Sequence, residues 1–134
     1  DHQTGLIELV SRPTFGGLAD GNSDVPSISA DGRNVAYYSF ATNLSLHDQN
    51  EFTDVFRYDR QKNVNELVSL GDWLQSGDNN SLCSAISQDG LVVAFYSYAQ
   101  NLLPGDRNNV PDVYLRDFSR ALPMYIFRFP LVLK

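Results

Sequence analysis

Two stretches of the sequence share one pattern of turn and strand. "SISADGRNVAYYSF", residues 27–40, and "AISQDGLVVAFYSY", residues 85–98, each place an Asp-Gly pair between a short apolar segment and a longer one. Asp-Gly pairs are typical of tight β-hairpins, because both residues tolerate the positive φ angles that such turns require. Each stretch therefore predicts a hairpin, and the chain contains this hairpin twice.

The similarity extends well beyond the two hairpins. When the sequence is aligned with itself at an offset of 58 residues, the alignment runs without a gap from Asp1 to the neighbourhood of Asp117. Of the 62 pairs from 1/59 to 62/120, 25 are identical, and they concentrate in the predicted turns and strand cores. Self-similarity at such a period indicates stacked structural repeats, each of which cannot bury its faces alone.

Each 58-residue unit predicts four short antiparallel strands. In the first unit they lie around "SIS" (27–29), at 35–40, at "DVFRYD" (54–59) and at "NELVSL" (65–70). The second strand is almost continuously apolar, which is typical of a strand covered on both faces, and no segment has helical periodicity. The fold class is therefore predicted as all-β, and four antiparallel strands per repeat are typical of a β-propeller blade.

These motifs resemble a known family of repeats. The pattern "S-x-D-G-x-x-V-A-[YF]" followed by "D-V-[FY]-x-x-D" is similar to the WD40-like repeats called PD40, which occur in TolB-like β-propellers, and the likeness covers nearly all of residues 1–118. The chain departs from the family at Ala30 and Gln88, where Pro often precedes the Asp-Gly turn, and in a longer loop before the third strand. The resemblance implies a bacterial, periplasmic or extracellular protein whose propeller binds other proteins or small ligands.

The repeat divides the chain into about two blades. A single partial propeller is expected, with an outer strand of a preceding blade at 1–16, one blade at 17–74, a second at 75–129 and a divergent C-terminal tail at 130–134. Propellers close with about four to eight blades, so we expect a fragment of a larger protein. The fourth strand of the second blade is placed at Met124–Phe129. Incomplete closure predicts self-association through exposed blade edges.

Composition and motifs narrow the possible functions. The chain of 134 residues has a net charge of −6, and its ten Lys and Arg are scattered, which argues against a nucleic-acid partner. No apolar run reaches the length of about 18 residues that a membrane-spanning helix needs. The two histidines, His2 and His47, fall in a turn and a loop, and no G-x-S-x-G, H-E-x-x-H or phosphate-binding glycine motif is present.

These observations predict a non-enzymatic scaffold or binding module with protein partners. Two alternatives stay open: an accessory propeller domain of a peptidase-type hydrolase, and a carbohydrate-active enzyme whose catalytic residues lie outside this chain. Within the repeat, Asp31 and Asp89 are expected to make hydrogen bonds in their turns. Trp73 is expected in the core between blades rather than in a sugar-stacking platform.

The loops before the third strands carry the one candidate cofactor site. "HDQNEFTD" (47–54) and "GDRNNVPD" (105–112) share the frame D-x-N-x-x-x-D. Oxygen-bearing side chains that alternate along a loop are a common way to bind Ca²⁺. The alternative is that Asp and Asn make Asx turns without metal, and the central glycine and downstream Glu of many calcium loops are missing. The candidate calcium ligands are Asp48, Asn50, Asp54, Asp106, Asn108 and Asp112.

Overall fold

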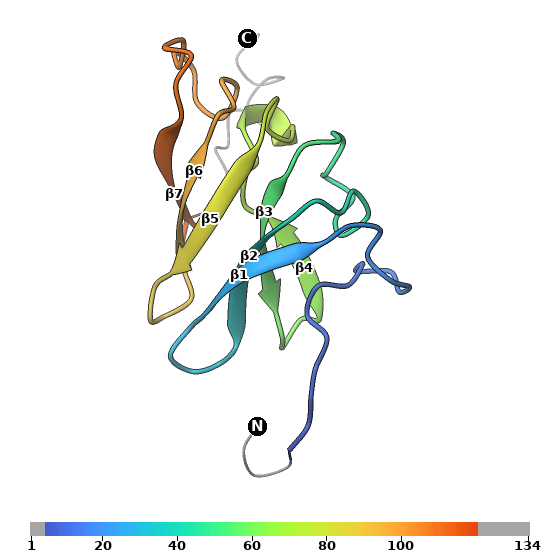
Figure 1. Ribbon diagram of the computed structural model, residues 1–134. Helices are drawn as coiled ribbons and strands as arrows, with labels where there is room; N and C mark the ends of the chain where they lie inside the picture. Colours follow the sequence, from blue (N-terminus) through green and yellow to red (C-terminus); the bar gives the residue numbers. More distant parts are fainter. Residues whose placement is uncertain (1–4, 121–134) are drawn as a thin grey trace, which may run out of the picture.

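The computed structural model describes residues 5–120, apart from the side chains of Cys83 and Ser84, and this part of the chain is all-β. It forms two open antiparallel sheets (Figure 1). The first has the strand order β1 (Ser23–Ile28), β2 (Asn34–Ser39), β3 (Asp54–Asp59) and β4 (Val64–Leu67). The second has the order β5 (Ser81–Ile86), β6 (Val92–Ser97) and β7 (Asp112–Asp117). The only helical element within residues 5–120 is η1 (Asp72–Leu74), which is too short to cross a membrane.

The two sheets follow the same pattern of strands and pairing. Each strand from β5 to β7 begins and ends 58 residues after its counterpart among β1 to β3. The first pair of strands is also in the same register, since Ser23 pairs with Ser39 and Ser81 pairs with Ser97. Both pairs shift register at the same place, between Asp24 and Ser27 in β1 and at the equivalent point of β5. The internal sequence repeat thus coincides with a repeat of backbone pairing.

The Asp-Gly turns are fixed by their own side chains, as expected. Asp31 Oδ1 accepts a hydrogen bond of 2.7 Å from the Ser29 hydroxyl, and Asp89 Oδ1 accepts one of 2.5 Å from the Ser87 hydroxyl. In each turn the same carboxylate oxygen also accepts from the backbone N–H two residues further on, at 3.0 Å. The glycines of these turns have φ angles of 72° and 74°, a region that favours glycine.

A second recurring contact explains why "ATNL" and "AQNL" occupy equivalent positions. The Asp20 backbone N–H donates to Asn43 Oδ1 (3.2 Å), as that of Asp78 donates to Asn101 Oδ1 (2.9 Å). The carboxylate of each Asp in turn accepts from the backbone N–H just before the Asn, at 2.7 Å in both units. The repeated Asp and Asn therefore tie the segment before the first strand to the loop after the second.

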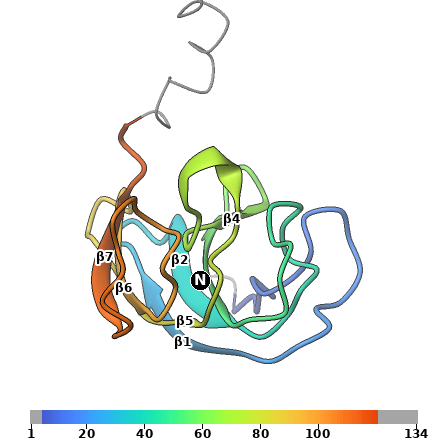
Figure 2. The same ribbon diagram turned by 90° about the horizontal axis from the view of Figure 1, so that it is seen from above.

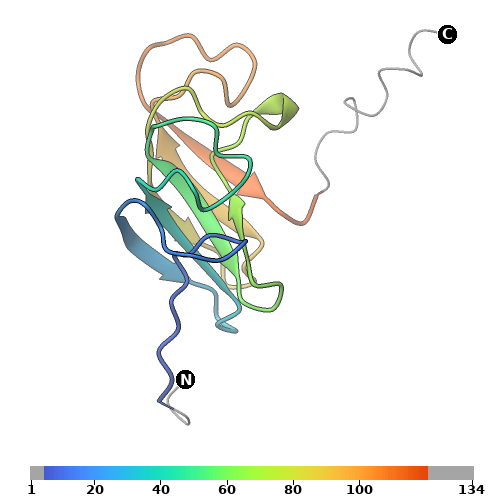
Figure 3. The same ribbon diagram turned by 90° about the vertical axis from the view of Figure 1, so that its right-hand side faces the viewer.

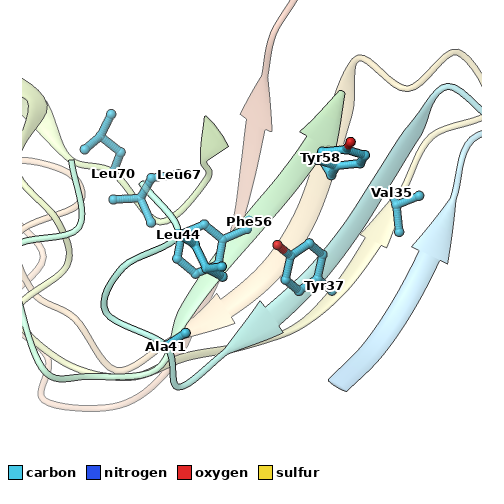
Figure 4. Close-up of a cluster of buried hydrophobic side chains, with 8 residues drawn as sticks. All are labelled: Val35, Tyr37, Ala41, Leu44, Phe56, Tyr58, Leu67 and Leu70. Carbon is cyan, nitrogen blue, oxygen red and sulfur yellow. The ribbon is translucent and has the colours of Figure 1, made fainter. Parts of the chain in front are cut away.

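The sheets pack face to face, and Figures 2 and 3 show them side by side. Alternation along β2 sends Ala36 toward the second sheet and Tyr37 to the opposite face. The core between the sheets consists of Ala36, Val55, Val68, Val93, Phe95, Ala99 and Leu102. The core on the opposite face of the first sheet (Figure 4) consists of Val35, Tyr37, Ala41, Leu44, Phe56, Tyr58, Leu67 and Leu70.

An outer strand of a preceding blade is predicted at 1–16, of which the structure describes residues 5–16. Residues 5–16 form no strand, because a strand requires a ladder partner and no described strand pairs with them. Side-chain bonds fix the segment instead, since the Asn65 amide donates to the carbonyls of Val10 (3.0 Å) and Arg12 (2.7 Å). Val10 packs on the first core, as Val68, its equivalent in the repeat, packs between the sheets.

Two further expectations have different outcomes. The prediction that Trp73 is a core residue is wrong: it lies in η1, in the connection between β4 and β5, belongs to neither core and has 54% of its surface exposed. The four-strand prediction is confirmed for the first sheet, whereas the second has three strands within the described part. Its predicted fourth strand, Met124–Phe129, and the tail at 130–134 lie outside the described residues.

Candidate functional site

The two D-x-N-x-x-x-D loops hold equivalent places in the fold. Each connects the second strand of its sheet to the third, and Asp54 and Asp112 are the first residues of β3 and β7. Both loops lie at the end of the sheets opposite the Asp-Gly turns (Figures 1 and 3). The fold therefore presents the same six candidate ligands as two separate triplets.

The first loop brings its three candidate residues together. The Asn50 backbone N–H donates to Asp48 Oδ1 at 3.3 Å, and the charge of Asp54 acts on Asp48. The Asn50 amide also donates to the carbonyl of Gly77 at 2.8 Å, which ties the loop to the segment before β5. Asp54 is buried, and its Oδ1 accepts a hydrogen bond of 2.5 Å from Ser69.

The other oxygen of each carboxylate in this loop has no partner. Asp48 Oδ2 and Asp54 Oδ2 are both buried, and neither accepts a hydrogen bond from the described part of the protein. No Lys or Arg among residues 5–120 forms an ion pair with either group. Burial, and then the charge of Asp54, raises the pKa of Asp48 to about 7, and burial raises the pKa of Asp54 to about 6. The folded protein thus disfavours the ionised form of both groups.

The second loop satisfies the equivalent oxygens with its own side chains. The Asn108 amide donates to Asp112 Oδ2 at 2.8 Å, and the Tyr114 hydroxyl donates to Asp106 Oδ2. Position 114 corresponds to Phe56 in the first unit, which has no hydroxyl to donate. The same sequence frame therefore produces two different environments.

Both loops also contain the Asx turns that were the alternative to metal binding. The Phe52 backbone N–H donates to Asn50 Oδ1 (2.7 Å), and that of Val110 donates to Asn108 Oδ1 (3.0 Å). These bonds account for the recurrence of Asn in the frame. They involve the asparagine oxygens only, so they leave the two unpartnered oxygens of the first loop unexplained.

Other candidate groups do not converge on a site. His47 is exposed in the first loop, and His2 lies outside the described residues. Within residues 5–120, no three side chains of His, Cys, Asp and Glu are grouped so as to hold a metal ion. Any cation at the first loop would therefore be bound by two carboxylates together with amide, hydroxyl, carbonyl or water oxygens.

Sequence reasoning missed the residues that surround the first loop. The Ser76 hydroxyl accepts a hydrogen bond of 3.3 Å from the Gln49 backbone N–H, and Ser69 bonds to Asp54. Both serines come from the segment that leads into the second unit, and no spacing in the frame points to them. The exchange of Phe56 for Tyr114 was visible in the self-alignment and could have distinguished the two loops.

Comparison with known proteins adds no assignment. No protein-family model matches the chain, and no curated protein matches it significantly. The functional argument consequently depends on the two sheets and the two loops.

Proposed function

We propose that this chain is part of a TolB-like β-propeller and acts as a non-enzymatic scaffold that binds other proteins. The recurrence of three strands at a spacing of 58 residues, with the same register and the same turns, supports this proposal. So does the packing of the two sheets face to face, as propeller blades pack. A periplasmic or extracellular location is part of the proposal and comes from the family resemblance alone.

One comparison between equivalent residues carries the argument. In β3, Val55 is 0% exposed and Arg57 is 5% exposed, because the second sheet covers this face. Their equivalents in β7, Val113 and Leu115, are 79% and 71% exposed. The first sheet therefore indicates what kind of surface fits this face of the second sheet: another sheet with aliphatic and aromatic side chains.

An exposed apolar sheet face is a typical site for protein association. Val113 and Leu115 lie on the same face of β7, since residues two apart in a strand point to the same side. The strand also has an open edge in the described part, whereas its counterpart β3 pairs with β4. An apolar surface of this kind favours a protein partner over a small polar ligand.

Sedimentation velocity tests the proposal. We expect the purified chain to associate as its concentration rises through the micromolar range, and Val113→Asp to shift it toward the monomer, because a carboxylate at this face would have to be buried without a partner. Val110→Asp is the matched control: Val110 is also exposed, but it lies in the loop before β7. It should associate like the wild type.

Two results would contradict the proposal. One is a compact monomer at every concentration, and the other is an equal loss of association in both variants. Circular dichroism of each variant separates lost association from lost folding.

A further inference from the structure

We propose that the first loop alone binds one divalent cation, Ca²⁺, through Asp48, Asn50 and Asp54, and that the second loop binds none. This inference concerns a ligand site and does not depend on the scaffold function. It also divides the six residues of the sequence motif into a binding triplet and a structural one.

The observation behind it is a pair of buried carboxylate oxygens that the protein leaves without partners. Asp54 is fully buried, with 0% of its surface exposed, yet its Oδ2 accepts no hydrogen bond, and Asp48 Oδ2 is in the same condition. A buried carboxylate without a partner is costly, and native proteins almost always pair such groups. A dication would neutralise both charges at once.

The two carboxylates act on the same region of space. Their charges interact, so they lie near each other, and the Asn50 backbone N–H donates to Asp48 Oδ1. Positively charged side chains do not take this role, since none of those described forms an ion pair with Asp48 or Asp54. When these two carboxyl groups are ionised, no positively charged side chain among the described residues compensates their charge.

The donors available there suit calcium. Ca²⁺ takes about six to eight oxygen ligands with flexible geometry, from carboxylates, amide and backbone carbonyls, hydroxyls and water. The loop offers two carboxylates and the Asn50 amide oxygen. The Ser76 hydroxyl also lies against this loop, where it accepts a hydrogen bond from the Gln49 backbone N–H. Oxygen donors of this kind suit a hard cation such as Ca²⁺ better than zinc, which prefers nitrogen and sulfur ligands.

The second loop serves as an internal comparison. It has the same Asp, Asn and Asp, but Asn108 and Tyr114 occupy the oxygens that are free in the first loop. Asn108 is exposed and Asp112 is only half-buried, so its carboxylates also have access to water. No unsatisfied buried oxygen there calls for a cation.

Calorimetric titration of the EDTA-treated chain with CaCl₂ tests the inference. We expect one site per chain in the wild type and in Asp106→Asn, and at least about tenfold weaker binding in Asp48→Asn. Thermal melts should agree: a hundredfold excess of Ca²⁺ over Kd should raise the Tm of the first two proteins by at least about 5 °C. Mg²⁺ should raise it less, because Mg²⁺ dehydrates reluctantly and demands octahedral geometry.

The melt without calcium distinguishes a ligand from a turn residue. If Asp48 binds the cation, Asp48→Asn should be at least as stable as the wild type in EDTA, because the amide removes a buried unpaired charge. A lower Tm in EDTA, without any calcium response in the wild type, would show a structural role and overturn the inference. Two sites per chain, equal losses in the two variants, or equal shifts with Mg²⁺ would also overturn it, and the site count needs no variant to fold.

Discussion

Phe56 stacks on Tyr37 with 6.0 Å between ring centroids, and the equivalent pair, Tyr114 and Phe95, stacks in the same way at 5.7 Å. The hydroxyl is carried by the residue of the second strand in the first pair and by the residue of the third strand in the second pair. In the first unit the hydroxyl of Tyr37 donates to Asn65 in the core. In the second unit the hydroxyl of Tyr114 donates to Asp106 in the loop. This exchange makes the two loops chemically different.

We therefore expect Tyr114→Phe to lower the free energy of unfolding by about 1 kcal/mol, the usual net value of one hydrogen bond. Tyr37→Phe should cost about 1–3 kcal/mol, because it leaves the buried Asn65 Oδ1 without this donor. Urea unfolding measures both changes, provided that the m value, the slope of unfolding free energy against urea concentration, is the same for the variants and the wild type. A larger loss for Tyr114→Phe would contradict the assigned roles of the hydroxyls.

Val55 and Val113 provide a second matched pair. Val55→Ala should lower the free energy of unfolding by about 2 kcal/mol, because it opens a cavity between the sheets. Val113→Ala should change it by less than about 0.5 kcal/mol, since the side chain is exposed. Denaturant unfolding at concentrations where the chain is monomeric checks both values. Equal losses would mean that the face of β7 is covered within one chain.

The glycines of the two Asp-Gly turns should differ in their tolerance of alanine. Both have positive φ angles, so Gly32→Ala should cost about 1 kcal/mol through backbone strain alone. A Cβ at Gly90 would in addition lie 2.5 Å from Asn34 Nδ2, whereas at Gly32 the nearest atom is 3.8 Å away. Gly90→Ala should therefore lose a further 1–3 kcal/mol, roughly the cost of overpacking, in thermal or urea melts. A smaller loss at Gly90 than at Gly32 would refute this packing.

Acid stability should depend on Arg33. Its guanidinium donates to both oxygens of Asp59 (3.0 and 2.8 Å) and lowers the pKa of that carboxyl to about 2. A folded-state pKa below the ordinary value of 3.8 means that the ionised group stabilises the fold above about pH 4 and that this contribution is lost as the pH falls toward 2. Arg33→Gln should thus be less stable than the wild type at neutral pH, and the difference should shrink between pH 4 and pH 2.

Arg60→Gln is the control for this experiment, because Arg60 is similarly exposed but pairs with Glu8 instead. Its stability relative to the wild type should change little over the same acid range. A difference between Arg33→Gln and the wild type that stays constant from pH 7 to pH 2 would argue against the Asp59 pairing.

Local pattern was sufficient to predict most strands. The third strand of each unit was placed at 54–59 and 112–117, which are the bounds of β3 and β7. These segments combine β-branched and aromatic residues with Asp at both ends, so propensity and turn chemistry agree. The outer strand at 1–16 stays a prediction: residues 5–16 pair with no described strand, and residues 1–4 lie outside the described part.

Tertiary context determined the features that the sequence could not predict. Arg57 is buried between the sheets, where it donates to the Gly90 carbonyl (2.8 Å) and lies 3.5 Å from the Phe118 ring centroid. A charged residue in a strand is ordinarily expected at the surface. Arg57 forms an ion pair with Glu66 of its own sheet, but Gly90 and Phe118, which cover it, come from the second sheet. For the same reason the repeated loop motif predicted two equal calcium sites, although the surroundings of the two loops differ.

Val10 packs on the core of the first sheet, and Val68, its equivalent in the repeat, packs in the core between the two sheets. Successive units therefore contact each other in one direction along the chain. Each sheet receives the preceding segment on one face and offers a different face to the next sheet, so contacts that continue this order are head-to-tail rather than two-fold symmetric. Head-to-tail contacts close into a ring only when the rotation per unit divides a full turn, and otherwise they extend into a helical filament. The angle between successive sheets is thus the quantity that separates a bounded assembly from an unbounded one.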